Sequence, residues 1–193
     1  NLKNEKWVRF SIGAEPASGK TAAILSKFYL LKKRNLVDFA IVVVPGTSIK
    51  PGWVRTSKNI FDLNVVENIT NLGIARWQGE QPSDIDAICI TYQQLQHNSE
   101  AYKLLLKNNR CVVILDEAHH LAEELKWGIT CSDIFLNEAH IISCSGTFFR
   151  TDGGKIFSLD YSDSGKAICD IEYTYGEGLS ENVLRPINFN FLD

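Results

Sequence analysis

The sequence predicts an α/β fold in which helices wrap a mainly parallel sheet. Three apolar runs of strand length carry the prediction: DFAIVVV at 38–44, IDAICIT at 85–91 and CVVIL at 111–115. Continuous apolar runs of this kind are typical of parallel strands that are buried on both faces. Segments with helical spacing of apolar residues separate the runs, and this alternation of strand and helix is typical of parallel-sheet proteins.

Each element is justified by periodicity or by the residues that end it. Residues 21–34 place apolar side chains at helical spacing and finish in a basic turn, which suits the negative end of a helix dipole. Pro45-Gly46 stops the strand at 38–44, and Asn108-Asn109 closes the helix before CVVIL. The expected strands are 7–13, 38–44, 60–67, 74–77, 85–91, 111–115, 140–145 and 187–192, and the expected helices are 21–34, 48–58, 92–107, 121–127, 133–138 and 177–184.

The segment after Arg150 has a different pattern. Residues 155–161 and 166–175 alternate on either side of Ser-Asp-Ser-Gly at 162–165, which predicts a hairpin of two antiparallel strands. We therefore expect residues 1–150 to form the main domain and residues 151–193 to be a hairpin and tail extension of that same domain.

Composition excludes several classes of protein. The chain is 45% hydrophobic and 22% charged, which is typical of a globular protein. No apolar run approaches the roughly 20 residues of a membrane span, and the polar start NLKNEKW does not resemble a signal peptide. The five cysteines are widely spaced with no CxxC pair, so we expect reduced core thiols, not disulfides or zinc ligands. These features predict a soluble, cytoplasmic protein with no membrane partner.

The charge is unevenly distributed along the chain. The formal net charge is −3, which by itself does not indicate a nucleic-acid binder. Residues 1–60 carry 11 Lys/Arg and 3 Asp/Glu, whereas residues 61–193 carry 9 and 20. A basic first third is suited to contacts with phosphates, and a solvated helix face at 32–34 is the alternative explanation for part of it.

A phosphate-binding loop is predicted where AEPASGKT joins the first strand to the first helix. Successive backbone N–H groups in such a loop, together with the positive start of the helix, bind phosphates. The lysine reaches the β- and γ-phosphates of a nucleotide, and the threonine hydroxyl coordinates Mg²⁺. A chance Gly-Lys-Thr at a helix start is the alternative. The candidate nucleotide-binding residues are Ala14, Glu15, Pro16, Ala17, Ser18, Gly19, Lys20 and Thr21.

Two adjacent carboxylates, Asp116 and Glu117, directly follow CVVIL. A buried strand delivers them to the edge of the sheet, where they suit two roles in nucleotide hydrolysis. Asp116 would hold Mg²⁺, directly or through water, and Glu117 would orient and deprotonate the attacking water, so that with Lys20 they form the predicted catalytic set. His119 is a candidate bridge between the nucleotide and neighbouring motifs. A solvated turn is the alternative for the acids, and a structural role is the alternative for the histidine.

Five separated motifs resemble a known family. In this order, AEPASGKT, DEAHH and SCSGTFFR resemble motifs I, II and III of the first RecA-like domain of superfamily two helicases and translocases, and DEAHH contains the DEAH box. VVVPGTSIKPGW resembles motif Ia, and ITYQQL resembles the segment that contacts the tracking strand in relatives of restriction-enzyme motor subunits and repair helicases. The resemblance spans residues 14–150, and TYGEGLSENVLRPI resembles the extension after motif III in phage and bacterial members.

The resemblance implies a three-layer P-loop NTPase (RecA-like) domain, the first motor domain of a longer ATP-dependent helicase or translocase. ATP and Mg²⁺ would be its cofactors, and its partners would be nucleic acid, DNA in preference to RNA, and a second RecA-like domain. Hydroxyls and backbone N–H groups contact nucleic-acid backbones, so an acidic overall charge does not exclude this. The resemblance assigns nucleic-acid contacts to Pro45, Gly46, Thr47, Ser48, Thr91, Tyr92 and Gln93, and coupling of hydrolysis to domain movement to Ser145, Gly146 and Thr147. A turn or strand-end role is the alternative for each.

The sequence also departs from the family pattern. Ala17 stands where glycine is usual, and Phe148 replaces the frequent proline of motif III. We find neither an upstream adenine-recognition motif nor a second RecA-like domain in the sequence. Arginine fingers normally come from that second domain and contribute about 10³ to 10⁵ in rate. We therefore expect the chain by itself to bind nucleotide weakly and hydrolyse it slowly. Two other interpretations stay open: a nucleotide- or DNA-binding module without turnover, and an RNA helicase domain.

Overall fold

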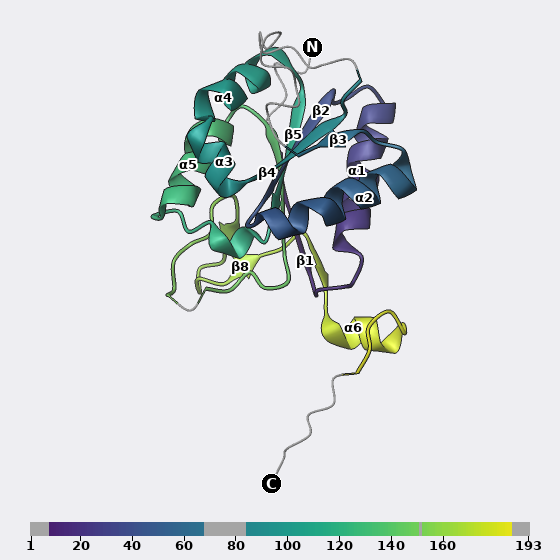
Figure 1. Cartoon of the computed structure of the whole chain (residues 1–193). Helices are drawn as coiled ribbons and strands as arrows, with labels where there is room; N and C mark the ends of the chain where they lie inside the picture. The colour runs from purple at the N-terminus through teal and green to yellow at the C-terminus, as the bar shows by residue number, and fades with distance from the viewer. Residues whose placement is uncertain (1–7, 68–83, 151, 187–193) are drawn as a thin grey trace.

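A seven-stranded sheet lies between two layers of helices in the computed structural model, which describes residues 8–67, 84–150 and 152–186 (Figure 1). The strand order is β3-β4-β2-β5-β6-β1-β9, and every neighbouring pair runs parallel. The predicted α/β fold is therefore confirmed. The strands are β1 (Arg9–Ala14), β2 (Phe39–Val44), β3 (Val65–Val66), β4 (Ala87–Thr91), β5 (Cys111–Asp116), β6 (His140–Ser145) and β9 (Ile171–Tyr173).

Each face of the sheet has its own apolar core. Helices α1 (Lys20–Lys33) and α2 (Lys50–Phe61) cover one face, and α3 (Tyr92–His97), α4 (Ser99–Asn108) and α5 (Lys126–Phe135) cover the other. Alternate residues of a strand point to opposite faces, so Val42 packs in the first core and its neighbour Val43 in the second. All six residues of β2 are buried for this reason, which explains its continuous apolar run.

The helix expected at 92–107 is two helices that meet at Asn98. This residue has φ −125° and ψ 30°, and its Nδ2 donates a hydrogen bond to the carbonyl of Gln94. A short polar side chain that bonds the preceding turn competes with helix continuation. The helix expected at 48–58 is present as the 3-10 turn η2 (Thr47–Ile49) followed by α2.

The prediction of two helices, at 121–127 and 133–138, is wrong, because a single helix, α5, runs from Lys126 to Phe135 and overlaps both ranges. The chain leaves β5 through the 3-10 turn η5 (Ala118–His120), and Ala122 then forms an isolated bridge with Ile156. This extended stretch delays the helix to Lys126. Gly128 packs on the carbonyl oxygen of Ala122, where an added Cβ would lie 1.9 Å from it, so only glycine fits.

Two further boundaries differ from the prediction. The strand expected at 60–67 shrinks to β3 because α2 continues to Phe61 and ends at Asp62, whose φ is 54°. The helix expected at 177–184 is α6 (Tyr175–Ser180), which begins earlier because Thr174 and Glu177 form a capping box. The strands expected at 74–77 and 187–192 lie outside the described residues.

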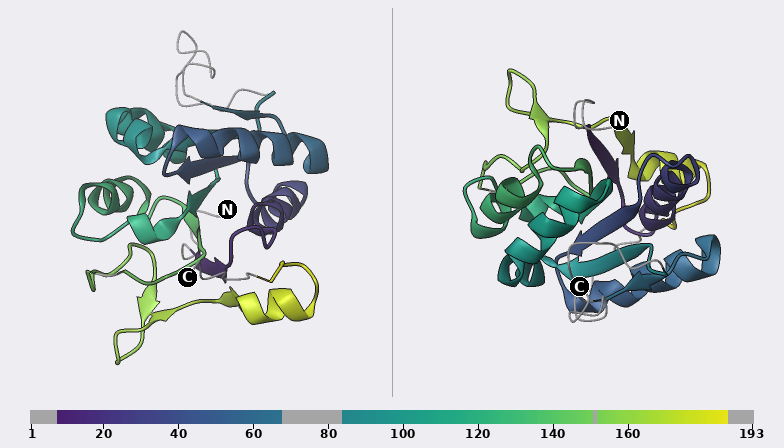
Figure 2. Two further views of the ribbon diagram at one scale, coloured as in Figure 1. Left: turned by 60° about the horizontal axis from the view of Figure 1, so that its bottom comes forward. Right: turned by 90° about the horizontal axis from the view of Figure 1, so that it is seen from above.

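The predicted hairpin is present as β7 (Asp160–Tyr161) and β8 (Ala167–Ile168), which pair antiparallel. It projects from the body of the domain (Figure 2). The second expected strand divides, and its later part, β9, joins the main sheet parallel to β1. Asp170 anchors this junction, because its Oδ2 accepts hydrogen bonds from the backbone N (2.7 Å) and Oγ (2.8 Å) of Ser11.

The cysteines are consistent with core thiols. All five are free, and four of them are buried, namely Cys89, Cys111, Cys131 and Cys144. Burial raises the pKa of the Cys111 thiol to about 12, so this sulfur stays protonated near neutral pH. Within the described ranges, none of the helices has the length and apolar character needed to cross a membrane.

Candidate nucleotide-binding site

The predicted site residues gather where three adjacent strands, β5, β6 and β1, reach their carboxyl ends. Gly13 of β1 is in register with Ser145 of β6, and Asp116 of β5 is in register with Cys144. The strand order alone therefore places the acids, the motif III loop and the phosphate loop next to one another. In open parallel sheets, ligands bind at this edge.

The phosphate loop, residues 15–19, turns tightly from β1 into α1. The backbone N–H of Ser18 donates to the carbonyl of Glu15 at 3.2 Å. Gly19 has φ 89° and Ala17 has φ 65°, both in the left-handed region that favours glycine. An L-residue with a side chain is strained there by about 1–2 kcal/mol. The unusual alanine therefore stands at a position where the loop needs a glycine conformation.

Two buried polar atoms, one in this loop and one at the first residue of α1, lack a hydrogen-bond partner among the described residues. Across the described residues, the buried side-chain polar atoms without a hydrogen-bond partner are Ser18 Oγ and Lys20 Nζ. Glu117 Oε1 lies 3.6 Å from Lys20 Nζ, which is an ion pair but too long for a hydrogen bond. Buried polar groups are nearly always bonded, so an orphaned pair at a helix start fits an anionic ligand such as a phosphate.

Asp116 is the most enclosed charged group of the site, with 7% of its surface exposed. Its Oδ2 accepts a hydrogen bond from Trp53 Nε1 at 2.8 Å, and its Oδ1 accepts one from the backbone N–H of Glu117 at 3.1 Å. The thiol of Cys144 also lies 3.4 Å from Oδ1. Burial raises the pKa of Asp116 above its usual range, and the hydrogen bonds from Trp53 and Cys144 oppose that shift.

Glu117 stands at the centre of a small polar network. Its backbone is left-handed, with φ 49° and ψ 51°, and its side chain is 28% exposed. One carboxylate oxygen faces Lys20, and the other lies 3.3 Å from His119 Nδ1 and 3.4 Å from Ser145 Oγ. Strained backbone that is held by its surroundings is common at functional sites.

His119 joins the DEAH segment to the motif III loop. Its Nδ1 lies 2.8 Å from Ser145 Oγ, and Ser145 in turn donates to the carbonyl of Thr147 and accepts from its backbone N–H. Burial and the neighbouring His120 hold the pKa of His119 below its ordinary value, which favours the neutral ring. Gly146 approaches the phosphate loop closely, since a Cβ there would lie 3.3 Å from Pro16.

The two segments expected to face nucleic acid follow β2 and β4 on the same edge of the sheet. Thr47, Ser48 and Gln93 have exposed side chains. Thr91 and Tyr92 are buried, because Thr91 caps α3 in a capping box with Gln94 and Tyr92 donates its hydroxyl to the carbonyl of Asp116 at 2.8 Å. Contact with a ligand through the Tyr92 side chain is therefore excluded in this conformation.

The donor set around Asp116 suits Mg²⁺ held jointly with a nucleotide. In the part of the chain that the structure describes, no group of three or more His, Cys, Asp or Glu side chains is arranged to hold a metal alone. Mg²⁺ usually takes one or two carboxylates and completes its shell with phosphates and water. The Thr21 hydroxyl, in the first turn of α1, and the Asp116 carboxylate, at the end of β5, are the residues present for this role.

A separate cleft of about 660 Å³ lies beside this cluster, between the motif III loop, the β7–β8 hairpin and β9. Ala14, Glu15, Gly146 and Thr147 form the end of the cleft that adjoins the site, whereas Lys20 and Asp116 do not line it. Sequence patterns missed both this cleft and the hydrogen bond from Trp53. The hydrogen bond from Trp53 could have been anticipated in part, because a buried indole N–H usually finds an acceptor.

Fold and site together define this chain as the first RecA-like domain of the superfamily two helicase type. The family model for the type III restriction enzyme, res subunit, matches residues 3–150. The chain therefore belongs to this family, and the family resemblance drawn from the motifs is confirmed.

Similar proteins were found both by sequence and by fold. Uncharacterized proteins of Mycobacterium leprae and Mycobacterium tuberculosis are 27% and 24% identical over 180 residues, which is 91% of this chain and 29% of each of them. The chain thus spans less than a third of these curated relatives. The SWI2/SNF2 ATPase core of Sulfolobus solfataricus matches in fold with TM-scores of 0.57 in complex with dsDNA and 0.54 as the core domain, at 19% and 18% identity. The matches cover 72% and 76% of this chain and 28% of each solved chain.

Proposed function

We propose that this chain is the ATP-binding motor domain of a DNA helicase or translocase. The observation that carries the proposal is the buried, unbonded Lys20 ammonium, which faces Glu117 beside a helix start and next to Asp116. A cation held in this way beside two acids is suited to receive phosphate oxygens. The family supports ATP hydrolysis, and the SWI2/SNF2 ATPase core, which is similar in fold, was solved in complex with dsDNA.

Each residue takes one role in this proposal. The loop at 15–19 and Lys20 bind the phosphates, while Thr21 and Asp116 hold Mg²⁺, which when bound neutralises charge that develops on the phosphates. Glu117 orients and deprotonates the attacking water. His119 and Ser145 position the Glu117 carboxylate through the contacts described above.

The nucleic-acid face comprises the segment at 45–48 together with Gln93. It lies at the carboxyl ends of β2 and β4, on the same edge as the phosphate loop. Exposed hydroxyls and backbone N–H groups are typical contacts with phosphate backbones. A second RecA-like domain would supply the arginines that complete catalysis.

Glu117→Gln in the full-length protein tests this function. The amide cannot accept the proton of water, so DNA-stimulated phosphate release should fall by about 10²-fold or more, while binding of a non-hydrolysable ATP analogue is retained. Glu124→Gln, an exposed acid of the following segment, is the matched control. Turnover at the wild-type rate in Glu117→Gln would contradict the proposal. Stimulation by RNA but not by DNA would assign the RNA helicase alternative.

A nucleotide-binding module without turnover is the second candidate, and the left-handed Ala17 favours it. A strained phosphate loop can hold a nucleotide and still place it poorly for reaction. Calorimetry with the ATP analogue and Mg²⁺, on the wild type and on Lys20→Ala, measures specific binding. Lysine-dependent binding without any DNA-stimulated turnover of the full-length protein would favour the module.

A further inference from the structure

Two buried aromatic side chains hydrogen-bond Asp116 from opposite faces of the sheet. Trp53, on α2, is 1% exposed and donates its indole N–H to the carboxylate oxygen Oδ2 at 2.8 Å. Tyr92, at the start of α3, is also 1% exposed and donates its hydroxyl to the backbone carbonyl at 2.8 Å. The first belongs to the core under α1 and α2, and the second to the core under α3, α4 and α5.

Each aromatic residue is rigidly attached to one of the segments that the proposed function places against nucleic acid. Trp53 lies in the first turn of α2, which follows η2 and its exposed Thr47 and Ser48 without a break. Tyr92 adjoins the exposed Gln93, and the capping box of Thr91 and Gln94 fixes this helix start. The ring of Tyr92 also stacks on Trp127, with ring centroids 5.4 Å apart.

Because these hydrogen bonds are buried, they cannot be broken without consequence. A buried donor or acceptor that loses its partner costs about 1–3 kcal/mol, and more for a charged group. A small displacement of η2 or of the α3 start must therefore either move Asp116 or break a costly bond. Packed cores respond to such displacements by shifting between discrete arrangements.

We propose that Trp53 and Tyr92 are positioning residues that couple nucleic-acid contact to the carboxylate that holds Mg²⁺. This inference rests on the proposed function, and it adds a route on the DNA side that is separate from the motif III contacts of Ser145 and Thr147. The indole sets the orientation of the Asp116 side chain, and the tyrosine hydroxyl sets the position of its backbone. Coupling between two sites is reciprocal, so nucleotide binding must change DNA affinity through the same residues.

The alternative is that both aromatics only fill the core. A core-filling role requires the rings but not the N–H or O–H groups, so removal of the polar atom alone separates the two explanations. Tyr92→Phe keeps the ring and its stacking on Trp127. Tyr102→Phe, a fully buried tyrosine of the same core on α4, is the matched control for loss of a hydroxyl. Trp53→Phe removes the indole N–H, but it also removes more side-chain volume than Tyr92→Phe does.

The test measures the ratio of two dissociation constants on the full-length protein. Binding of a fluorescent DNA duplex is followed by anisotropy with and without Mg²⁺ and a non-hydrolysable ATP analogue. Allosteric couplings typically correspond to about 5- to 150-fold changes in affinity. We expect this ratio to move towards unity by about 2- to 30-fold in Tyr92→Phe and in Trp53→Phe, and to keep its wild-type value in Tyr102→Phe. Because the ratio compares one variant with itself, a uniform loss of stability does not change it.

Three outcomes decide the inference. A ratio that moves towards unity in Tyr92→Phe but not in Tyr102→Phe supports the inference. This result stands even where Trp53→Phe does not fold. The inference is overturned, while the ATPase assignment is left intact, if Tyr92→Phe keeps the wild-type ratio or if the ratio changes equally in Tyr102→Phe. A wild type that binds no nucleotide overturns the proposed function itself, and the inference with it.

Discussion

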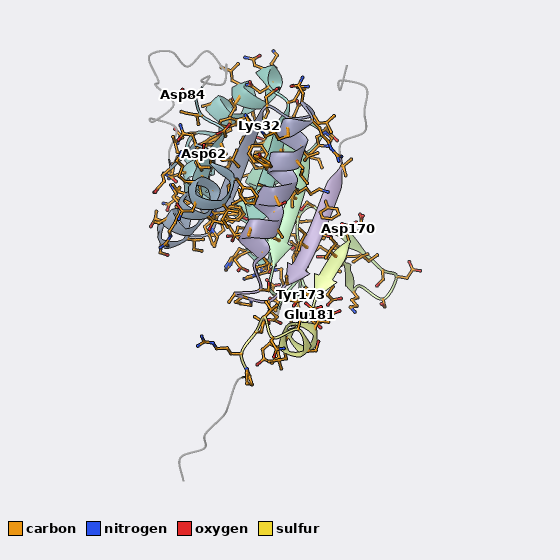
Figure 3. All side chains as sticks on the ribbon, turned by 90° about the vertical axis from the view of Figure 1, so that its right-hand side faces the viewer. Lys32, Asp62, Asp84, Asp170, Tyr173 and Glu181 are labelled. Atoms are coloured by element: carbon orange, nitrogen blue, oxygen red, sulfur yellow. The ribbon has the colours of Figure 1, made fainter. Side chains whose placement is uncertain are left out.

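Charged side chains at the two ends of the parallel sheet differ in how fully they are hydrogen-bonded. At the amino end, Arg110 donates from its Nε to Asp38 at 2.9 Å and from a terminal nitrogen to the side chain of Asn35 at 3.0 Å. Lys32 donates to the carbonyl of Asp38 at 2.8 Å and pairs with Asp86 at 3.0 Å. Arg110 and Lys32 thus each bond to two other residues. Lys32 lies towards this end of the domain, and Tyr173 and Glu181 lie towards the other (Figure 3).

At the carboxyl end, two buried polar side-chain atoms lack hydrogen bonds to the described residues. Lys20 Nζ and Ser18 Oγ have no hydrogen-bond partner among residues 8–67, 84–150 and 152–186, and Ala17 and Glu117 adopt positive φ angles. Strain and unsatisfied groups lower stability unless a ligand uses them. The contrast therefore shows that Lys32 and Arg110 are bonded within the protein at one end of the sheet, whereas the ammonium of Lys20 at the other end is left available for a ligand.

The two lysines at the ends of α1 give the largest expected difference. Lys20→Ala removes a charge-assisted contact with phosphate, which is worth about 1.5–3 kcal/mol, so affinity for an ATP analogue should fall roughly 10- to 150-fold. Its free energy of unfolding should not fall below that of the wild type, because the buried ammonium has no hydrogen-bond partner among the described residues and an unsatisfied buried group lowers stability. Calorimetry and urea unfolding measure the two quantities.

Lys32→Ala is the matched control on the same helix. It should lower the free energy of unfolding by at most about 1 kcal/mol and leave nucleotide affinity unchanged, because its partners are Asp38 and Asp86 at the far end. An equal loss of nucleotide affinity in both variants would break the distinction between the two ends.

The phosphate loop gives the second prediction. Ala17→Gly removes the side chain from a left-handed position, and we expect a gain of about 0.5–1 kcal/mol in the free energy of unfolding after the entropy of glycine is counted. Ala23→Gly, at an exposed position inside α1, should instead cost about 1 kcal/mol. Urea unfolding of both variants measures the difference, and effects of the same sign would show that Ala17 is not strained.

Most of the fold was predictable from the sequence because it follows from local patterns. The buried strands are continuous apolar runs in the sequence. Gly-Lys-Thr between a strand and a helix marked the segment in which Ser18 Oγ and Lys20 Nζ lack hydrogen-bond partners among the described residues. Because parallel strands deliver their carboxyl ends to one edge, Asp116 and Lys20 were expected together although they lie far apart in the chain. These inferences need no knowledge of tertiary contacts.

What the sequence missed depends on contacts between distant segments. The late start of α5 follows from the left-handed Glu117 and from the packing of Gly128 against Ala122. The parallel pairing of β9 follows from the bonds between Asp170 and Ser11. Trp53 in an amphipathic helix looks like an ordinary core residue, and nothing local indicates that its indole reaches the acid at the end of β5.

The smallest expected effect concerns the amino end and its dependence on pH. The hydrogen bond from Arg110 holds the pKa of Asp38 below its usual value of 3.8. A carboxyl with a lowered pKa in the folded state contributes stability that is fully present above its usual pKa and is lost as the pH falls through the folded-state pKa. Asp38→Asn should therefore lower the free energy of unfolding at about pH 7, by no more than about 1 kcal/mol because the pair is partly exposed.

Urea unfolding of Asp38→Asn and the wild type at about pH 7 and about pH 3 checks this sign. The difference between them should be smaller at the lower pH, because the contribution of the ionised Asp38 is being lost there. Asp163→Asn, in the exposed turn of the hairpin, controls for the loss of one negative charge. A difference that grows towards low pH would mean that Arg110 does not stabilise the ionised carboxylate. The comparison between the two ends of the sheet would then fail for this pair.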